Sequence, residues 1–128
     1  MPADAAAVAR ALALAGRFAA GAGLDSAAAT SLAIIVEEWV ANIVEHGEAR
    51  PGALIVMRLS LEGVAVRLAV SDAGRPFDPR SATFDGPNPE RGGGVGLALI
   101  ADLCRLVSYA RRRGRNQLVL ELPLAPRG

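Results

Sequence analysis

The 128-residue sequence contains no lysine, because all of its 14 basic residues are arginine. This excludes mechanisms that depend on a lysine side chain, including the phosphate-binding lysine of a P-loop and Schiff-base chemistry. The sequence also has a single cysteine, Cys104, and a single histidine, His46. One thiol cannot form a disulfide within the chain, and one thiol with one imidazole makes a poor metal site. The neighbouring leucine and valine residues favour a buried, structural role for Cys104.

The sequence also has little net charge and few long apolar runs. The formal net charge is +1, which offers no electrostatic basis for binding nucleic acid or an anionic membrane surface. We expect no membrane-spanning segment, because no apolar run reaches that length without interruption by Arg, Asp or Gly. The alanine-rich start carries Asp4 before Arg10 and Arg17, an order unlike that of a signal peptide. The expected location is therefore the cytoplasm, with neither nucleic acid nor a membrane as a direct partner.

The length suits one domain spanning residues 1–128. Hydrophobic residues make up 52% and aromatic residues only 4%, which predicts a core of alanine, leucine and valine. Helical spacing and glycine stops predict helices over 4–22, about 25–46 and from the glycines at 92–96 to about 103. Alternating apolar residues predict two hairpins, with strands over 53–61 and 64–71 and over 106–111 and 117–122. This order predicts an α+β two-layer sandwich, one sheet with three helices on one face.

A polar row marks the second predicted helix, where Glu38, Asn42 and His46 follow one another at intervals of four residues. At this spacing they line one side of the helix, beside its apolar face. Such a row can be surface decoration, and a histidine at a helix end often only packs or caps locally. An acid, an amide and an imidazole in line also suit the wall of a site. The segments that follow decide between these interpretations.

Two glycine-bearing segments supply the other parts that a nucleotide site needs. Asp72-Ala73-Gly74 follows a predicted strand, and Gly92-Gly93-Gly94-Val95-Gly96 opens a predicted helix. Alone, the first is most often a turn and the second a flexible cap. Together they suit phosphate, because a helix N-terminus offers free N–H groups and glycines allow close approach of the backbone. Asn42 could supply one oxygen to Mg²⁺, and Glu38 could orient or deprotonate a nucleophile.

These motifs resemble those of the GHKL, or Bergerat-fold, ATPases, in the form found in anti-sigma factor serine/threonine-protein kinases. Glu38-x-x-x-Asn42-x-x-x-His46 is similar to the N box of that family. Asp72-x-Gly74-x-x-Phe77-Asp78 is similar to its G1 box, and residues 91–100 are similar to its G2 box. The resemblance covers nearly the whole chain. It implies the Bergerat fold, with a mixed sheet of about four to five strands, and the binding of ATP with Mg²⁺.

The resemblance also implies a role for each matching residue. Glu38 would be the general base, and Asn42 would hold Mg²⁺ on the phosphates. Asp72 would accept a hydrogen bond from the adenine amino group, and Gly74 would leave room for the base. Residues 79–93 would form a lid over ATP. The residues expected to contact the cofactor are Asn42, His46, Asp72, Gly74, Phe77, Arg91, Gly92, Gly93, Gly94, Val95, Gly96, Leu97 and Asn116.

Three features depart from the family pattern. Pro76 stands where the wider superfamily has a second glycine, which favours the anti-sigma branch over sensor histidine kinases. Asn116 stands near the position where relatives often carry threonine, close to the adenine. The family usually opens with a strand, whereas here a helix is expected almost from residue 4. That edge strand is expected to be missing or very short, which leaves a homodimer an open question.

The resemblance implies a serine/threonine protein kinase that acts as an anti-sigma factor in a partner-switching module. Its partners would be an anti-sigma-factor antagonist, which it would phosphorylate on serine, and a sigma factor or another target. A second hypothesis is a module that binds nucleotide and sequesters its partner without phosphotransfer. A third is a structural domain that binds no nucleotide.

Overall fold

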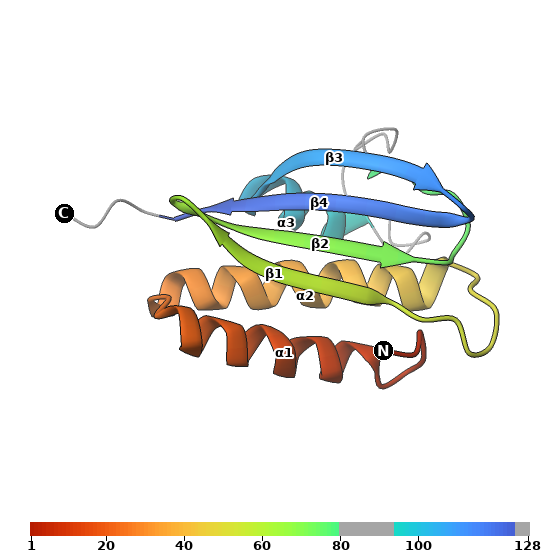
Figure 1. Ribbon diagram of the computed structural model, residues 1–128, viewed down its shortest axis with the longest axis horizontal. Helices are drawn as coiled ribbons and strands as arrows, with labels where there is room; N and C mark the ends of the chain where they lie inside the picture. The colour runs from red at the N-terminus through yellow and green to blue at the C-terminus, as the bar shows by residue number, and fades with distance from the viewer. Residues whose placement is uncertain (80–93, 125–128) are drawn as a thin grey trace.

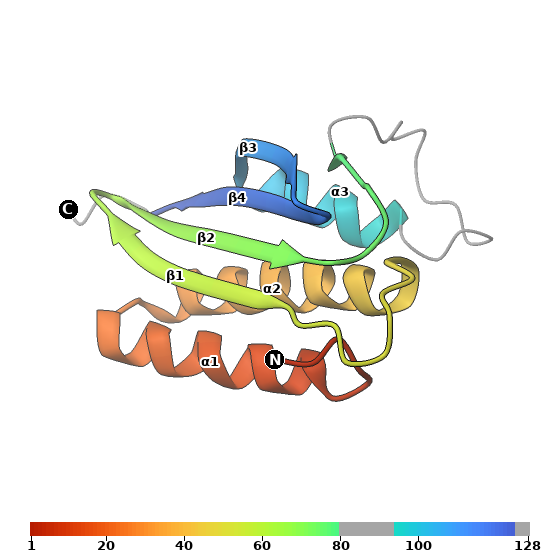
Figure 2. The same ribbon diagram turned by 45° about the vertical axis from the view of Figure 1, so that its right-hand side comes forward.

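Residues 1–79 and 94–124 are described by the structure, a computed structural model. They form two layers, with a sheet over a layer of helices (Figure 1). The predicted α+β sandwich, with its helices on one face of the sheet, is confirmed (Figure 2). The elements are α1 (Ala7–Ala22), α2 (Ser26–His46), β1 (Val56–Glu62), β2 (Ala65–Asp72), α3 (Gly94–Leu103), β3 (Arg105–Arg112) and β4 (Arg115–Pro123).

The described strands form one sheet in the order β1-β2-β4-β3, and each neighbouring pair is antiparallel. The expectation of a mixed sheet is therefore wrong for this part of the chain. β2 and β3 do run in the same direction, as a connection through α3 favours, but β4 lies between them. A tight turn at Arg113-Gly114, with both φ angles positive, returns β3 into β4 beside β2.

A row of alanines forms the buried face of α1. Ala7, Ala11, Ala15 and Ala19 are buried and lie four residues apart, so they form one stripe along the helix. Such small side chains allow α1 to approach α2 closely. Gly23 ends the helix in the left-handed conformation, with a φ of 69°. The core is rich in alanine on this side, as the composition predicts.

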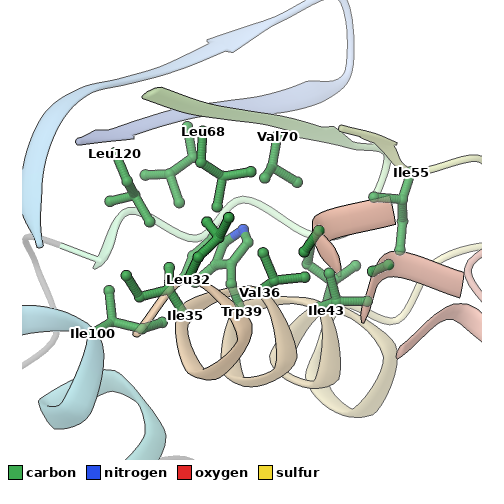
Figure 3. Close-up of a cluster of buried hydrophobic side chains, with 14 of the residues drawn as sticks. Leu32, Ile35, Val36, Trp39, Ile43, Ile55, Leu68, Val70, Ile100 and Leu120 are labelled. Atoms are coloured by element: carbon green, nitrogen blue, oxygen red, sulfur yellow. The ribbon is translucent and has the colours of Figure 1, made fainter. Parts of the chain in front are cut away.

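The helix α2 lies at the centre of the core. Asp25 caps its N-terminus by accepting a 2.8 Å hydrogen bond from the backbone N–H of Ala28. Its apolar face meets Leu68 and Val70 of the sheet, and Ile100 of α3 closes one side (Figure 3). The buried residues of α2 are Leu32, Ile35, Val36, Trp39, Val40 and Ile43. Because these side chains fix α2 under the sheet, the polar row beside them also has a fixed position.

By length and composition alone, α2 meets the criterion for a helix that crosses a membrane. The expectation that no apolar run reaches such a length is therefore wrong for this helix. Its apolar character has a cause within the fold. The sheet, α1 and α3 all pack around α2 (Figures 1 and 2), so apolar residues occupy much of its circumference.

A very short strand precedes α1. Pro2 forms an isolated antiparallel bridge with Leu54. On either side of it, Met1 exchanges hydrogen bonds with Ile55, and the N–H of Ala3 donates to the carbonyl of Ala53. The expected edge strand is thus present in a reduced form, and it joins the start of the described chain to the segment that enters β1.

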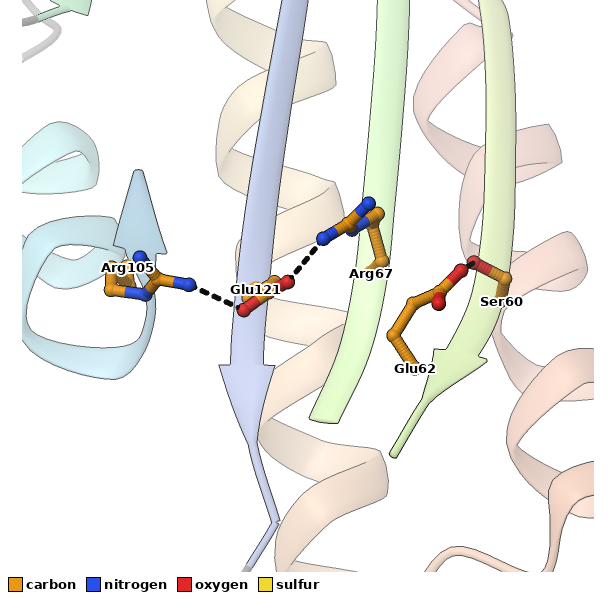
Figure 4. Close-up of polar contacts among 5 residues, drawn as sticks. All are labelled: Ser60, Glu62, Arg67, Arg105 and Glu121. Atoms are coloured by element: carbon orange, nitrogen blue, oxygen red, sulfur yellow. Dashed lines mark hydrogen bonds and ion pairs between the residues drawn. The ribbon is translucent and has the colours of Figure 1, made fainter. Parts of the chain in front are cut away.

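The face of the sheet away from the helices carries a polar network. Glu121 of β4 accepts hydrogen bonds from Arg67 of β2 at 2.6 Å and from Arg105 of β3 at 2.7 Å (Figure 4). In β1, Ser60 donates a 3.3 Å hydrogen bond to Glu62. The hydrogen bond from Arg67, followed by that from Arg105, lowers the pKa of the Glu121 carboxyl. This face of the sheet is therefore exposed to solvent, whereas the opposite face packs on the helices.

Candidate functional site

A cleft opens at the C-terminal end of α2, beside the residues that end β2 and begin β4. Its volume is about 290 Å³, including the space at its open mouth. The segment that leaves β2, residues 72–77, contributes one wall. Segments far apart in the sequence meet here, and the lining residues are Trp39, Asn42, Ile43, His46, Gly47, Asp72, Arg75, Phe77 and Asn116. The structure therefore brings together five predicted site residues, namely Asn42, His46, Asp72, Phe77 and Asn116.

Asp72 is the buried acid of the cleft. It is the last residue of β2, lies opposite Asn116 of β4 and exposes only 4% of its surface. Its Oδ1 accepts hydrogen bonds from the N–H of Gly74 at 2.9 Å and from Nδ2 of Asn116 at 3.1 Å. Within the described ranges, Oδ2 receives no hydrogen bond. One carboxylate oxygen thus keeps its capacity to accept a hydrogen bond from a ligand in the cleft.

Gly74 lies where the loop after β2 meets the end of α2. A Cβ at this position would lie 2.7 Å from the carbonyl oxygen of Gly47 and 2.9 Å from Oδ1 of Asp72, so the site requires glycine. The next residue, Arg75, donates its N–H to the Gly47 carbonyl at 2.6 Å and its Nε to the His46 carbonyl at 2.8 Å. A guanidinium at the last carbonyls of a helix is also favoured by the helix dipole. The loop is thereby fastened to α2.

The polar row on α2 reaches the cleft in part. Asn42 and His46 line it, whereas Glu38, one turn earlier, is half-buried and lies outside the lining. Among the residues that the structure describes, the side chains of Glu38 and Asn42 form no hydrogen bond or ion pair. Nε2 of His46 is buried, receives no hydrogen bond from residues 1–79 or 94–124, and lies 3.7 Å from the carboxylate of Glu45. Asn42 and His46 thus form part of the cleft wall, and contact of either with a ligand stays a prediction.

Three side chains of this region were not predicted from the sequence to belong to the site. Trp39 is buried in the core and also lines the cleft, and its ring centroid lies 6.1 Å from that of Phe77. Tyr109 of β3 donates a hydrogen bond to Asn116, and Arg75 closes the loop onto α2. The place of Trp39 within the α2 motif was a usable signal. For Tyr109 and Arg75 the sequence holds no local signal, because their hydrogen bonds join different elements of the fold.

Comparison with family models identifies the domain. The model described as "Histidine kinase-like ATPase domain" matches residues 1–122. The chain belongs to this family. The resemblance of the motifs to the GHKL superfamily is thereby confirmed at the level of the domain, whereas membership of the anti-sigma branch stays a prediction. No functionally curated protein matches the sequence.

Solved structures similar to this histidine kinase-like ATPase domain include two of one bacterial kinase. They are the histidine kinase domain of the Erythrobacter litoralis EL346 blue-light activated histidine kinase and a structure of that kinase, with TM-scores of 0.55 and 0.56. Both are 21% identical to this chain and match 76% of it. The matches span 45% and 30% of the two solved chains, so this chain is similar to less than half of either. The likeness shows a shared fold.

The glycine-rich segment of this histidine kinase-like ATPase domain is described from Gly94 onward. Gly94, Val95, Gly96 and Leu97 form the first turn of α3, a helix of 10 residues. The other predicted contacts of this segment, Arg91, Gly92 and Gly93, lie outside the described residues, as do residues 80–93 of the expected lid. Phosphate contacts from the glycine-rich segment therefore stay a prediction.

The donor set of the cleft fits a metal bound together with a ligand. Over residues 1–79 and 94–124, no group of three or more His, Cys, Asp or Glu side chains could hold a metal ion. A divalent cation beside Asn42 would therefore take most of its ligands from phosphate oxygens and water, as Mg²⁺ usually does. An amide oxygen near a buried carboxylate thus suits a magnesium nucleotide better than a permanently bound metal.

Proposed function

We propose that this domain binds ATP with Mg²⁺ in the cleft and acts as a serine/threonine protein kinase. The observation that carries the proposal is the buried carboxylate of Asp72, held at the cleft with one oxygen free of hydrogen bonds from the described residues. An oxygen left free in this way can accept a hydrogen bond from a donor on a ligand in the cleft. The exocyclic amino group of adenine is such a donor.

The base would enter between the loop after β2 and the C-terminal end of α2. Gly74 has no side chain, which lets the loop approach the helix without filling the cleft. Phe77 and Trp39 supply apolar surface next to Asp72, suited to the faces of a flat ring. Apolar walls with one fixed polar group are the usual composition of a site for a small aromatic ligand.

The phosphates would extend toward the row on α2. Asn42 would hold the cation through its side-chain oxygen, and the first turn of α3 would direct N–H groups at the phosphates. ATP with Mg²⁺ supplies the phosphoryl group and neutralises part of its charge. The task left to the protein is to hold the acceptor hydroxyl in line and to remove its proton.

Glu38 is the residue that we propose for proton removal. It lies one turn before Asn42 on the same side of α2, and within the described residues no other group occupies its carboxylate. A half-buried carboxylate next to the metal-binding amide can accept the proton of a serine hydroxyl as that oxygen attacks the phosphorus. Glu38 lies outside the cleft lining, so we expect a partner protein to bring the hydroxyl to it.

The proposed partner is an anti-sigma-factor antagonist that carries the serine. In the unphosphorylated form it would capture this domain, which otherwise would hold a sigma factor or another target. The similarity of the motifs to the anti-sigma branch, including Pro76 in place of a second glycine, supports this choice. A second candidate is a module that binds nucleotide and sequesters its partner without transfer, and the position of Glu38 outside the cleft lining favours it.

Phosphotransfer with paired variants tests the proposal. We expect [γ-³²P]ATP to label a serine of a cognate antagonist, with Glu38→Gln slowing the transfer by about 100-fold or more. Glu37→Gln is the matched control, because Glu37 is the adjacent, exposed carboxylate of α2. Both variants should bind ATP as the wild type does. Equal transfer rates in Glu38→Gln and the wild type would overturn the role of Glu38, and ATP binding without any transfer would favour the sequestration module.

A further inference from the structure

The side-chain amide of Asn116 uses all of its hydrogen-bonding capacity within the chain. Its Nδ2 donates to Oδ1 of Asp72 at 3.1 Å and to the carbonyl of Arg75 at 2.8 Å. Its Oδ1 accepts from the N–H of Phe77 at 3.3 Å and from the hydroxyl of Tyr109. An amide side chain has two N–H donors and two oxygen lone pairs, so none remains for a ligand.

Chemistry fixes the orientation of this amide. The carbonyl of Arg75 can only accept a hydrogen bond, and the N–H of Phe77 can only donate one. With the amide turned over, its oxygen would face the Arg75 carbonyl and the Asp72 carboxylate, and its NH₂ would face the Phe77 N–H. The observed orientation is therefore the favourable one. It follows that the Tyr109 hydroxyl donates its proton to Oδ1 of Asn116.

The same amide fixes the loop that leaves β2. It holds Asp72 at the start of the loop and the backbone of Arg75 and Phe77 further on. From β3, Arg111 donates a 2.7 Å hydrogen bond to the carbonyl of Gly74. Asn116 itself is only 3% exposed, and buried networks with every member satisfied are rigid. The carboxylate of Asp72 is thus held in one orientation before any ligand binds.

We propose that Asn116, oriented by Tyr109, is a positioning residue that aims the Asp72 carboxylate and so sets the preference for a base with an exocyclic amino group. The inference rests on the proposed binding of ATP and refines it. Asn116 lines the cleft but acts through Asp72, because its hydrogen-bonding groups are all used within the chain. This role replaces the direct contact with the cofactor expected from the sequence. Without Asn116, the Asp72 carboxylate would keep only the hydrogen bond from the N–H of Gly74 among the described residues. The carboxylate could then rotate.

The ratio of ATP affinity to ITP affinity tests this inference. ITP carries a carbonyl where ATP carries the amino group, so a well-aimed carboxylate accepts from ATP and repels ITP. We expect the wild type to prefer ATP by about 10- to 100-fold, the effect of one hydrogen bond to a charged group. Asn116→Ala should reduce this preference to about 3-fold or less, and Tyr109→Phe should reduce it by about 2- to 5-fold. Gln117→Ala is the control, because Gln117 is the exposed neighbour on the opposite face of β4.

The affinity ratio separates positioning from a merely structural role. General damage to the fold weakens the binding of ATP and ITP alike and leaves the ratio at its wild-type value. A wild-type preference that survives in both Asn116→Ala and Tyr109→Phe would overturn this inference and leave the proposed function intact. If Asn116→Ala does not fold, the ratio in Tyr109→Phe decides alone. A wild type that binds ATP and ITP equally, or neither, would overturn the proposed function together with this inference.

Discussion

Gly74 fixes the geometry of the cleft because it has no side chain, which lets the loop after β2 lie against the end of α2. The loop approaches α2 so closely that a Cβ at position 74 would lie 2.7 Å from the carbonyl oxygen of Gly47. In the middle of α1, a Cβ at Gly16 would meet nothing within 4 Å. The same substitution should therefore have opposite effects at these two positions, since packing limits one and helix propensity governs the other.

We predict that Gly74→Ala lowers the free energy of unfolding by about 1–3 kcal/mol, because the loop and the end of α2 must separate. The same variant should weaken ATP binding. Gly16→Ala should instead raise the free energy of unfolding by about 0.5–1 kcal/mol and leave ATP affinity unchanged. Urea denaturation measures the stabilities, and calorimetry measures the affinities. Equal changes in stability for the two variants would show that the contact between Gly74 and Gly47 is loose.

Cys104 is expected to be an unreactive thiol. Burial raises the pKa of the Cys104 thiol from 9.0 to about 11, and its Sγ donates to the carbonyl of Ile100 at 3.1 Å. The thiolate is the reactive form, so at pH 8 iodoacetamide should modify the folded protein about 100-fold more slowly than the urea-unfolded protein. The difference should shrink as the pH rises toward 11. Equal rates at pH 8 would contradict the burial of the thiol.

The raised pKa of Cys104 also has a consequence for stability. The folded protein holds the thiol proton more tightly than the unfolded chain does. The stabilising contribution of the neutral thiol is therefore complete below pH 9.0 and is lost as the pH rises through the folded pKa of about 11. Cys104→Ser should reduce this alkaline loss, because the serine hydroxyl does not ionise in that range.

Among the elements, α2 has the largest influence on the site, because it supplies both the core face and the polar row. Asp25 begins this helix by accepting a hydrogen bond from Ala28, far from the cleft. We predict that Asp25→Ala lowers the free energy of unfolding by about 1 kcal/mol. Asp25→Asn keeps an acceptor oxygen and should lose less than half as much. In thermal denaturation, equal losses in both variants would indicate that the negative charge near the helix N-terminus matters more than the cap itself.

The sheet contributes an acid-sensitive element on its outer face. Glu121 joins three strands through Arg67 and Arg105, which lower the pKa of its carboxyl below 4.5. The stability from this network is therefore present above pH 4.5 and is lost as the pH falls through the lowered pKa. We predict that the wild type loses stability more steeply on acidification than Glu121→Gln does. Parallel urea midpoints for the two proteins across that range would argue against a role for the network.

At the scale of the whole molecule, local patterns were predictable and pairings between distant segments were not. Helical spacing and the glycine stops located the helices, and alternation located both hairpins, with ends that differ by at most three residues. The parallel pairing implied by the family resemblance was wrong, because β4 inserts between β2 and β3. Sequence spacing does not specify which strand fills that place.

The residues of the candidate site also fall into those that local sequence patterns predict and those that they do not. Asn42, His46 and Asp72 were predictable because each belongs to a motif within a single element or turn. Tyr109 and Arg75 were not, because their roles depend on hydrogen bonds across 7 and 29 residues of sequence. The residues that position a site are often harder to identify than those that bind, since no local pattern requires them.

Both the proposed function and the role of Asn116 require ATP binding in the cleft, and isothermal titration calorimetry of the full chain measures this binding most directly. ATP and ADP, each with Mg²⁺, would be titrated into the wild type and into Asp72→Asn. The account predicts that the wild type binds both nucleotides. Asp72→Asn should bind at least about 10-fold more weakly, because a hydrogen bond to a charged group contributes about 1.5–3 kcal/mol. A folded wild type that binds neither nucleotide would contradict the account at its centre.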